Sequence, residues 1–179
     1  MNSEIFNNFL LAAQQMAHVD IGLNESFLEI YQLNWQSVKI LARCNEGSHK
    51  ILMRYAQAIH LNSEYLPYFT LYLVRRVEND FKTVRLLENF ESPFLTLYNE
   101  NKKLSSGSTS IENYLILIRK SYWDSAFDED LFGDKVALNI IYLQALHEVE
   151  KGYVEASQPT RNKLTSLQAK GDKIEVDHF

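Results

Sequence analysis

The stretch that decides the fold spans residues 26–61 and reads SFLEIYQLNWQSVKILARCNEGSHKILMRYAQAIHL. From Phe27 to Leu33 the side chains divide between two faces with a period of two, and SVKILAR reads as a second strand after the polar turn NWQS. After Gly47 the apolar residues recur at helical spacing, and Ser48 is the expected N-cap of that helix. The stretch therefore predicts a β-hairpin followed by a helix.

More strand-like segments follow this helix. YFTLYLVRR is rich in aromatic and β-branched residues, and FKTVRLL, SPFLTLY and ENYLILI are further strand candidates. The polar, Ser-rich segment at 99–110 predicts a loop. Two strands, a helix and then more strands is the order of a ubiquitin-like β-grasp, an α+β arrangement around one core. We expect this unit at residues 22–122.

A helix is predicted before the β-grasp unit, within SEIFNNFLLAAQQMA at residues 3–17. Its polar face holds Asn and Gln rather than Lys or Arg. A helix on an anionic membrane normally carries cations there, so this one is expected to pack against protein. Its apolar residues keep helical spacing; they are Ile5, Phe6, Phe9, Leu10, Ala13 and Met16.

The composition changes after Trp123. From Asp134 to Lys151 the chain is apolar around most of a helical circumference, with Asp134 as the expected cap and Gly152 as the expected end. A more exposed helix is predicted from Pro159, and the tail GDKIEVDHF is expected to fray. The chain therefore changes after Trp123 from an α+β unit to an all-helical one.

This helical part carries more apolar surface than its own helices can bury. The helix with Leu164 and Leu167 is expected to cover only part of the apolar helix before it. We therefore expect the second half of the chain to be loose or self-associating. The residues that cannot all be covered are Ile140, Ile141, Leu143 and Leu146.

Composition and charge exclude several classes of protein. The chain has 179 residues, 46% of them hydrophobic, which is enough for a real core. The formal net charge of −5 offers no basic face for nucleic acid. Cys44 is the single cysteine, so no intrachain disulfide can form and a reducing, cytoplasmic setting is expected.

Motifs for catalysis or metal binding are missing or incomplete. The acids between Asp124 and Asp134 fail the ligand spacing of a calcium loop whichever acid is counted first. His147-Glu148 lacks the second histidine of a zinc site, because Lys151 stands in its place. Phosphate-binding glycine loops and nucleophile elbows are also missing from the sequence. We expect no cofactor and no enzymatic activity.

Two sets of residues are candidates for interaction or packing. Tyr122 and Trp123 stand between the last strand and the apolar helix, so we expect both to be buried where the two units meet. Removal of the Trp123 side chain would then cost about 3 kcal/mol of stability. A second set lies on the second strand and the first helix of the β-grasp unit, where ubiquitin-like units can bind small GTPases; the alternative is ordinary surface charge. These residues are Lys39, Arg43, Lys50 and Arg54.

Four segments of the sequence closely resemble the FERM-like sorting nexins, the group that includes sorting nexins 17 and 31. They are PYFTLYLVRR, IRKSYWDSAFDEDLF, ALNIIYLQALHEVEKGY and LTSLQAK. The N-terminal FNNFLLAAQQ resembles the end of the helix that closes the PX domain of that family. The resemblance implies the end of a PX domain at residues 1–19, a first FERM lobe at 22–122 and part of a second lobe at 123–179.

The resemblance also implies a function. In this family a PX domain binds endosomal phosphoinositide, and a third FERM lobe takes up the NPxY-type tails of cargo receptors. Both sites would lie outside residues 1–179, so this chain is expected to contact its partners through the other lobes. It would then be a non-enzymatic piece of an adaptor on early endosomes. The alternatives are a ubiquitin-like FERM module that binds a small GTPase and an uncharacterised enzyme.

Overall fold

A computed structural model of the protein describes residues 25–105 and 113–176. The helix predicted at 3–17 and the proposed PX segment at 1–19 lie outside these residues. The chain divides into two compact units, with the division inside a helix, between Leu143 and Gln144. Each unit is described by itself below.

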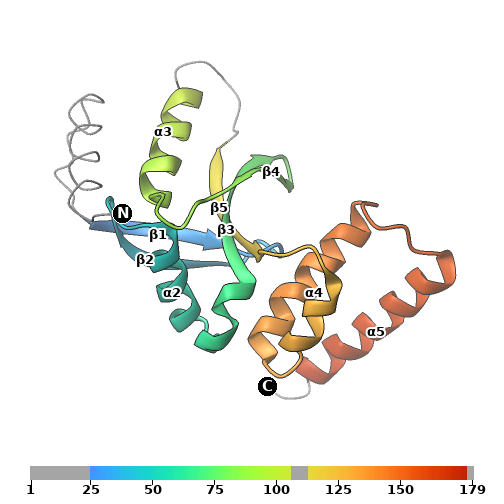
Figure 1. Cartoon of the computed structure of the whole chain (residues 1–179). Helices are drawn as coiled ribbons and strands as arrows, with labels where there is room; N and C mark the ends of the chain where they lie inside the picture. Colours follow the sequence, from blue (N-terminus) through green and yellow to red (C-terminus); the bar gives the residue numbers. More distant parts are fainter. Residues whose placement is uncertain (1–24, 106–112, 177–179) are drawn as a thin grey trace. The chain divides into compact units, whose positions relative to one another are not determined.

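A single five-stranded sheet forms the centre of the first unit (Figure 1). The strand order is β2-β1-β5-β3-β4. The β1–β2 hairpin is antiparallel, β1 runs parallel to β5, and β3 is antiparallel to both β5 and β4. This is the predicted β-grasp, and the α+β fold class is confirmed. The strands are β1 (Glu25–Tyr31), β2 (Ser37–Arg43), β3 (Phe69–Val77), β4 (Asp80–Leu86) and β5 (Tyr114–Lys120).

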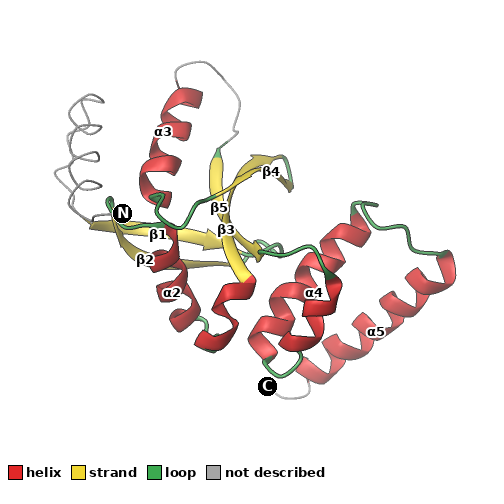
Figure 2. Cartoon of the chain, in the orientation of Figure 1, coloured by secondary structure: helices red, strands yellow, loops and turns green. Residues whose placement is uncertain are grey.

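Helices and short 3-10 segments connect and follow these strands (Figure 2). Within the described residues, none of the helices is long and apolar enough to cross a membrane. The elements are α2 (Ser48–Ala58), η1 (Ser63–Tyr68), α3 (Pro93–Ser105), η2 (Ser125–Leu131), α4 (Lys135–Glu150) and α5 (Gln158–Val176).

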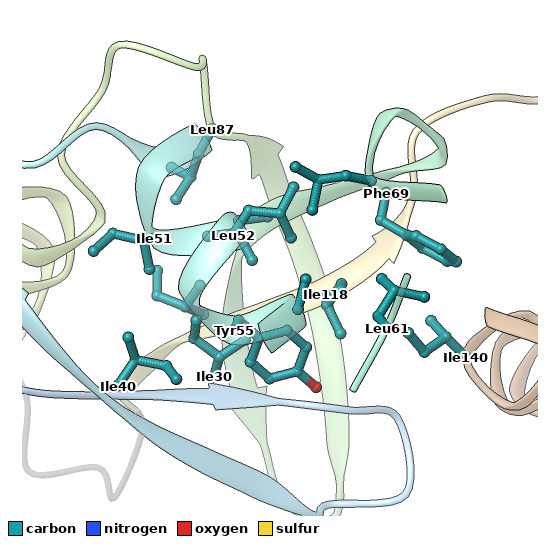
Figure 3. Close-up of a cluster of buried hydrophobic side chains, with 14 of the residues drawn as sticks. Ile30, Ile40, Ile51, Leu52, Tyr55, Leu61, Phe69, Leu87, Ile118 and Ile140 are labelled. Carbon is teal, nitrogen blue, oxygen red and sulfur yellow. The ribbon is translucent and has the colours of Figure 1, made fainter. Parts of the chain in front are cut away.

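The main core lies between the sheet and α2 (Figure 3). Alternation along β1 points Leu28 and Ile30 to this side, where they meet Ile51 and Tyr55 of α2. A fully buried side chain of this size contributes about 1.5–3 kcal/mol. Tyr55 is fully buried, and its hydroxyl accepts a hydrogen bond from Gln32 Nε2 at 3.0 Å, so its polar atom is satisfied. The alternation of side chains that the sequence shows in β1 therefore determines which of its residues enter the main core.

A smaller cluster covers the other face of the sheet. Phe81 is buried there, together with Leu117 of β5. Trp35, from the β1–β2 turn, stacks on Phe81 with ring centroids 3.9 Å apart, and the Arg76 guanidinium lies 5.1 Å from the Trp35 ring. Trp35 has a φ of 67°, a conformation that bulky residues rarely adopt, so the stacking holds a strained turn in place.

The start of α2 is capped by backbone rather than by Ser48. The Ser48 and His49 N–H groups donate to the carbonyls of Glu91 and Asn89, at 2.8 and 3.3 Å. The Ser48 hydroxyl donates to the carbonyl of Glu88 at 2.6 Å, so the prediction that Ser48 is the N-cap is wrong. The loop at 87–92 supplies the acceptors that a capping side chain would otherwise provide.

The segment SPFLTLY forms the start of α3, so the predicted strand is wrong. Ser92 caps this helix: its Oγ accepts from the Leu95 N–H at 3.2 Å and its carbonyl accepts from the Thr96 N–H. Pro93 occupies the first helical position, where its missing N–H costs nothing. Cap and proline together override the β preference of the aromatic and β-branched residues. The same helix occupies 99–105, which was predicted to be loop.

The ends of α4 follow the prediction. Asp134 Oδ1 accepts from the Val136 and Ala137 N–H groups, both at 2.8 Å. At the other end Gly152 has a φ of 72°, and the Tyr153 N–H donates to the Glu148 carbonyl, which completes a Schellman motif. α5 continues to Val176, so the expected fraying of the tail is wrong up to that residue.

Burial along α4 is uneven. Ile140 and Ile141 are buried in the core of the first unit. Leu143 and Leu146 are half-buried, so the four apolar residues are not all covered, as predicted. Leu164 and Leu167 of α5 are 41% and 53% exposed, and cover of the apolar helix by α5 stays a prediction. Looseness or self-association of this half stays a prediction.

Candidate protein-interaction surface

Four basic side chains gather along one edge of the sheet, which we call the β2–α2 edge. Lys39 and Arg43 lie on β2, the outermost strand on this side. Lys50 and Arg54 lie one turn apart on α2, which packs against the same strand. The hairpin–helix order therefore brings together the four residues that the sequence analysis selected.

Each of these four cations has a carboxylate partner. Register pairs Glu25 with Arg43 and Glu29 with Lys39 across the hairpin. The Arg43 Nε lies 2.7 Å from Glu25 Oε1, and the Lys39 Nζ lies 3.3 Å from Glu29 Oε1. Both ion pairs are exposed, so solvent screens them and neither is a main source of stability.

Glu46 is the partner of the two helix cations and is itself buried. Its carboxylate receives a bidentate contact from the Arg54 guanidinium, with both distances 2.6 Å, and the Lys50 Nζ lies 3.6 Å away. It also accepts the Arg43 backbone N–H at 2.9 Å. Burial raises the pKa of Glu46, but these hydrogen bonds and charges outweigh burial and hold the pKa below its usual value. Glu46 therefore stays ionised and fixes the end of β2 to α2.

Arg54 also protects the open edge of the sheet. Its Nη1 donates to the Leu41 carbonyl at 2.7 Å, and β2 is the outermost strand. An exposed strand edge is a template for pairing with another chain, and a charged side chain on the edge blocks that pairing. A partner that adds a strand here must first displace Arg54 from the Leu41 carbonyl.

The electrostatic character of the β2–α2 edge follows from these contacts. The edge holds four cations and three carboxylates, which leaves one net positive charge. A shallow hollow of about 300 Å³ lies between β2 and Arg54. The surface offers alternating charges around the apolar Leu41 side chain, which is 47% exposed. It can bind a protein of mixed charge better than a uniformly acidic ligand.

The sequence led us to expect Trp123 in the core, and this prediction is wrong. The Trp123 side chain is 92% exposed, whereas the neighbouring Tyr122 is half-buried against the main core. The Tyr122 ring meets the rings of Tyr68 and Phe127 at centroid distances of 5.9 and 5.6 Å. Tyr122 and Trp123 follow the end of β5 at Lys120, and only the first of these two side chains packs on the main core.

The acidic segment around η2 is a structural feature of the fold. Asp124 caps η2 by accepting the Ala126 N–H at 2.9 Å. Asp128 accepts the Tyr122 hydroxyl at 2.6 Å; burial and this bond together raise the pKa of Tyr122. Asp130 accepts the Tyr68 hydroxyl at 2.9 Å. The residues that the structure describes contain no group of three or more His, Cys, Asp or Glu side chains that could hold a metal ion.

We predict that Trp123→Ala changes the free energy of unfolding by less than about 0.5 kcal/mol, because the side chain already faces solvent. Tyr122→Ala is the matched variant and should cost about 2 kcal/mol, below the range for fully buried aromatic residues. Urea unfolding followed by circular dichroism measures both values. A Trp123→Ala loss as large as that of Tyr122→Ala would contradict the exposed position.

Two family models match the chain in succession. The model for the F1 lobe of the FERM domain of sorting nexins 17, 27 and 31 matches residues 26–123, more than half of the chain. The chain belongs to this sorting nexin family. The model for the F2 lobe of the FERM domain of sorting nexins 17 and 31 matches residues 124–177. The boundary between the F1 and F2 matches falls directly after Trp123.

Individual relatives agree with the family models. Sorting nexin-17 of Danio rerio is 35% identical over 97% of this chain, which covers 35% of that protein. Sorting nexin-31 of Homo sapiens is 31% identical over 94% of this chain, which covers 36% of that protein. The chain thus spans about a third of the length of these relatives.

A solved FERM structure shares the fold. It is the MyTH4-FERM MF2 domain of Dictyostelium discoideum myosin VII. The alignment covers 84% of this chain and 29% of the myosin chain, with a TM-score of 0.55 and 13% sequence identity. At that identity the likeness concerns the fold alone. It agrees with the β-grasp assigned to the F1 match.

The partners of the basic residues in the F1 lobe were not expected from the sequence, although a signal for them was present. Once the hairpin is placed, its register sets Glu25 opposite Arg43 and Glu29 opposite Lys39. Glu46 and Lys50 stand four residues apart, the spacing of a helical ion pair. Counting the acidic as well as the basic residues on this strand pair and helix would have shown that most of the positive charge is neutralised.

Proposed function

We propose that this chain is the F1 lobe and part of the F2 lobe of a non-enzymatic adaptor that sorts membrane-protein cargo on endosomes. The observation that carries the proposal is the uninterrupted succession of F1 and F2 matches over residues 26–177. A β-grasp core followed by helices, without a gathered set of metal ligands in the described part, suits a scaffold. The work of this part is to hold other parts of the adaptor and its partners in position.

The proposal divides the chain and its partners as follows. Residues 1–19 end a PX domain, residues 22–122 form the F1 lobe and residues 123–179 form part of the F2 lobe. Phosphoinositide membranes and NPxY-type receptor tails bind through parts outside residues 1–179. The protein is cytoplasmic and associates with early endosomes from that side.

Two measurements test this proposal. In cells, depletion of the full-length protein should lower the surface level of receptors with NPxY tails, and re-expression should restore it. In vitro, residues 1–179 alone should bind neither NPxY peptides nor phosphoinositide vesicles, with the full-length protein as the positive control. Unchanged receptor levels would contradict the sorting role. Peptide or vesicle binding by residues 1–179 would contradict the proposed division.

A second candidate function is binding of a small GTPase at the β2–α2 edge. It is favoured by the gathering of Lys39, Arg43, Lys50 and Arg54 on the outermost strand and its neighbouring helix. The three carboxylates at the same edge moderate the attraction to an acidic GTPase surface. We therefore expect binding to be weak and its salt dependence to be shallow, because charge complementarity mainly speeds the encounter.

Variants that change one charge at a time test the GTPase candidate. Lys39→Ala should weaken binding of a nucleotide-loaded Ras-type GTPase several-fold, and Lys163→Ala, a matched change on the exposed face of α5, should leave it unchanged. Titration calorimetry at two salt concentrations provides the affinities. Equal affinities for the wild type and Lys39→Ala, or no binding at all, would leave these residues as ordinary surface charges.

A further inference from the structure

The loop that joins α4 to α5 carries the most exposed tyrosine of the chain (Figure 2). The Tyr153 side chain is 73% exposed. It follows Gly152, which ends α4, and no further helix or strand begins before α5 at Gln158. All five residues from Lys151 to Glu155 are exposed. An exposed loop without regular structure is a segment that another enzyme can take into its active site.

The other nine tyrosines are held by the fold, and all ten lie in the residues that the structure describes. Tyr98 and Tyr142 are 41% and 45% exposed, but they lie inside α3 and α4. The remaining seven are buried or half-buried; they are Tyr31, Tyr55, Tyr65, Tyr68, Tyr72, Tyr114 and Tyr122. Tyr153 is therefore the tyrosine that can enter the active site of another enzyme without the unfolding of a helix or strand.

The charges close to Tyr153 in the sequence are mainly negative. Within five residues on either side stand the acids Glu148, Glu150 and Glu155, and Lys151 is the single Lys or Arg. A basic cleft attracts such a segment and speeds its encounter, whereas an acidic cleft repels it. The enzyme that fits this loop therefore has a basic substrate cleft.

We propose that Tyr153 is a phosphorylation site for a protein tyrosine kinase with a basic substrate cleft. The Tyr153 hydroxyl oxygen attacks the γ-phosphorus of ATP, and a new O–P bond forms. The bond between that phosphorus and the oxygen bridging it to the β-phosphorus breaks, so ADP leaves, and an aspartate of the kinase accepts the hydroxyl proton. The inference does not depend on the proposed adaptor function.

A phosphate on Tyr153 acts on the end of α4. The Tyr153 N–H donates to the Glu148 carbonyl at 2.9 Å, a bond of the motif that closes the helix. The C-terminus of a helix is the negative end of its dipole, and the Glu148 and Glu150 carboxylates add negative charge there. A phosphate with a charge of about −1.5 to −2 is repelled by all three, and one cation, Lys151, opposes this repulsion. Phosphorylation therefore weakens the last turn of α4.

Phosphorylation in vitro tests the site. Residues 1–179 are incubated with ATP, Mg²⁺ and the catalytic domain of a Src-type tyrosine kinase, and mass spectrometry of the peptides locates the phosphate. We expect Tyr153 to carry most of it, and Tyr153→Phe to remove most of the incorporation. Tyr142→Phe, the matched change at the next most exposed tyrosine, should leave the rate unchanged. Phosphate at Tyr142 or Tyr98 as fast as at Tyr153, or none at Tyr153, would overturn the proposal.

NMR of the phosphorylated chain tests the effect on α4. The Cα chemical shifts of Val149 and Glu150, in the last turn, should move towards random-coil values after phosphorylation. Those of Asn139, in the first half of the same helix, should stay where they are. The Tyr153→Phe chain, treated with kinase and ATP in the same way, is the control and should show no change. Unchanged or more helical shifts at Val149 and Glu150 in the phosphorylated chain would overturn the weakening of the last turn.

Discussion

Gly47→Ala is expected to lower the free energy of unfolding by about 3 kcal/mol, at the upper end of the usual cost of overpacking. A Cβ atom at Gly47 would lie 2.6 Å from the Asn89 carbonyl oxygen and 3.3 Å from the Phe90 Cα. Both neighbours are backbone atoms, so no side-chain rotation relieves the contact. Asn89 also accepts the His49 N–H, so moving its carbonyl disturbs the capping of α2.

Two other glycines provide matched controls for Gly47→Ala. A Cβ at Gly133 would meet only the Tyr65 hydroxyl, at 3.2 Å, and that side chain can move, so Gly133→Ala should cost less than about 0.5 kcal/mol. Gly152 has open space around it but a positive φ, so Gly152→Ala should cost about 1 kcal/mol through backbone strain alone. Urea unfolding of the three variants gives the ranking. Equal losses for Gly47→Ala and Gly133→Ala would contradict the close backbone approach.

Glu46→Ala is expected to cost about 2 kcal/mol. Removing one partner of a buried ion pair usually costs 3–5 kcal/mol, roughly, and the lower value applies here because Arg54 is 38% exposed and can be hydrated when its partner is lost. The variant also removes the acceptor of the Arg43 N–H. Glu29→Ala, which breaks only the exposed pair with Lys39, should cost at most about 1 kcal/mol. A larger loss for Glu29→Ala than for Glu46→Ala would contradict the central place of Glu46.

Glu46 should also shape the stability of the protein in acid. Its folded-state pKa lies below the unfolded value of about 4.3, so its contribution is complete above that pH and is lost as pH falls through the lower folded pKa. The difference in unfolding free energy between the wild type and Glu46→Gln should therefore shrink below about pH 4. Chemical unfolding at a series of pH values measures it. A difference that stays constant through this range would contradict the lowered pKa.

The sequence predicted the elements whose pattern is local. Alternation in β1 and β2 and helical spacing in α2 are visible in single segments, and so were the caps of α4. The segment SPFLTLY misled the prediction because its aromatic and β-branched residues favour a strand, whereas Ser92 and Pro93 start a helix there. Weighing the cap and the proline above the composition would have predicted the helix.

The sequence predicted the four basic residues of the candidate site but not the carboxylates that neutralise most of their charge. Lys39, Arg43, Lys50 and Arg54 were chosen from strand and helix positions, and the fold brings them to one edge. Their carboxylate partners depend on register and on the burial of Glu46, which no single segment reveals. The prediction for Trp123 was wrong because it rested on the position of Trp123 between two apolar segments, and that position does not decide which of two neighbouring aromatic residues is buried.

The backbone capping of α2 has a consequence for the order in which the chain folds. The acceptors for the first N–H groups of α2 come from Asn89 and Glu91, some forty residues further along the chain. During synthesis the β1–β2 hairpin and the body of α2 can form early, but the first turn of α2 stays uncapped until residue 91 has been made. Such distant closures slow folding, because the entropy of the intervening loop must be lost first. We therefore expect the loop at 87–92 to join late, onto a hairpin and helix that were made long before it.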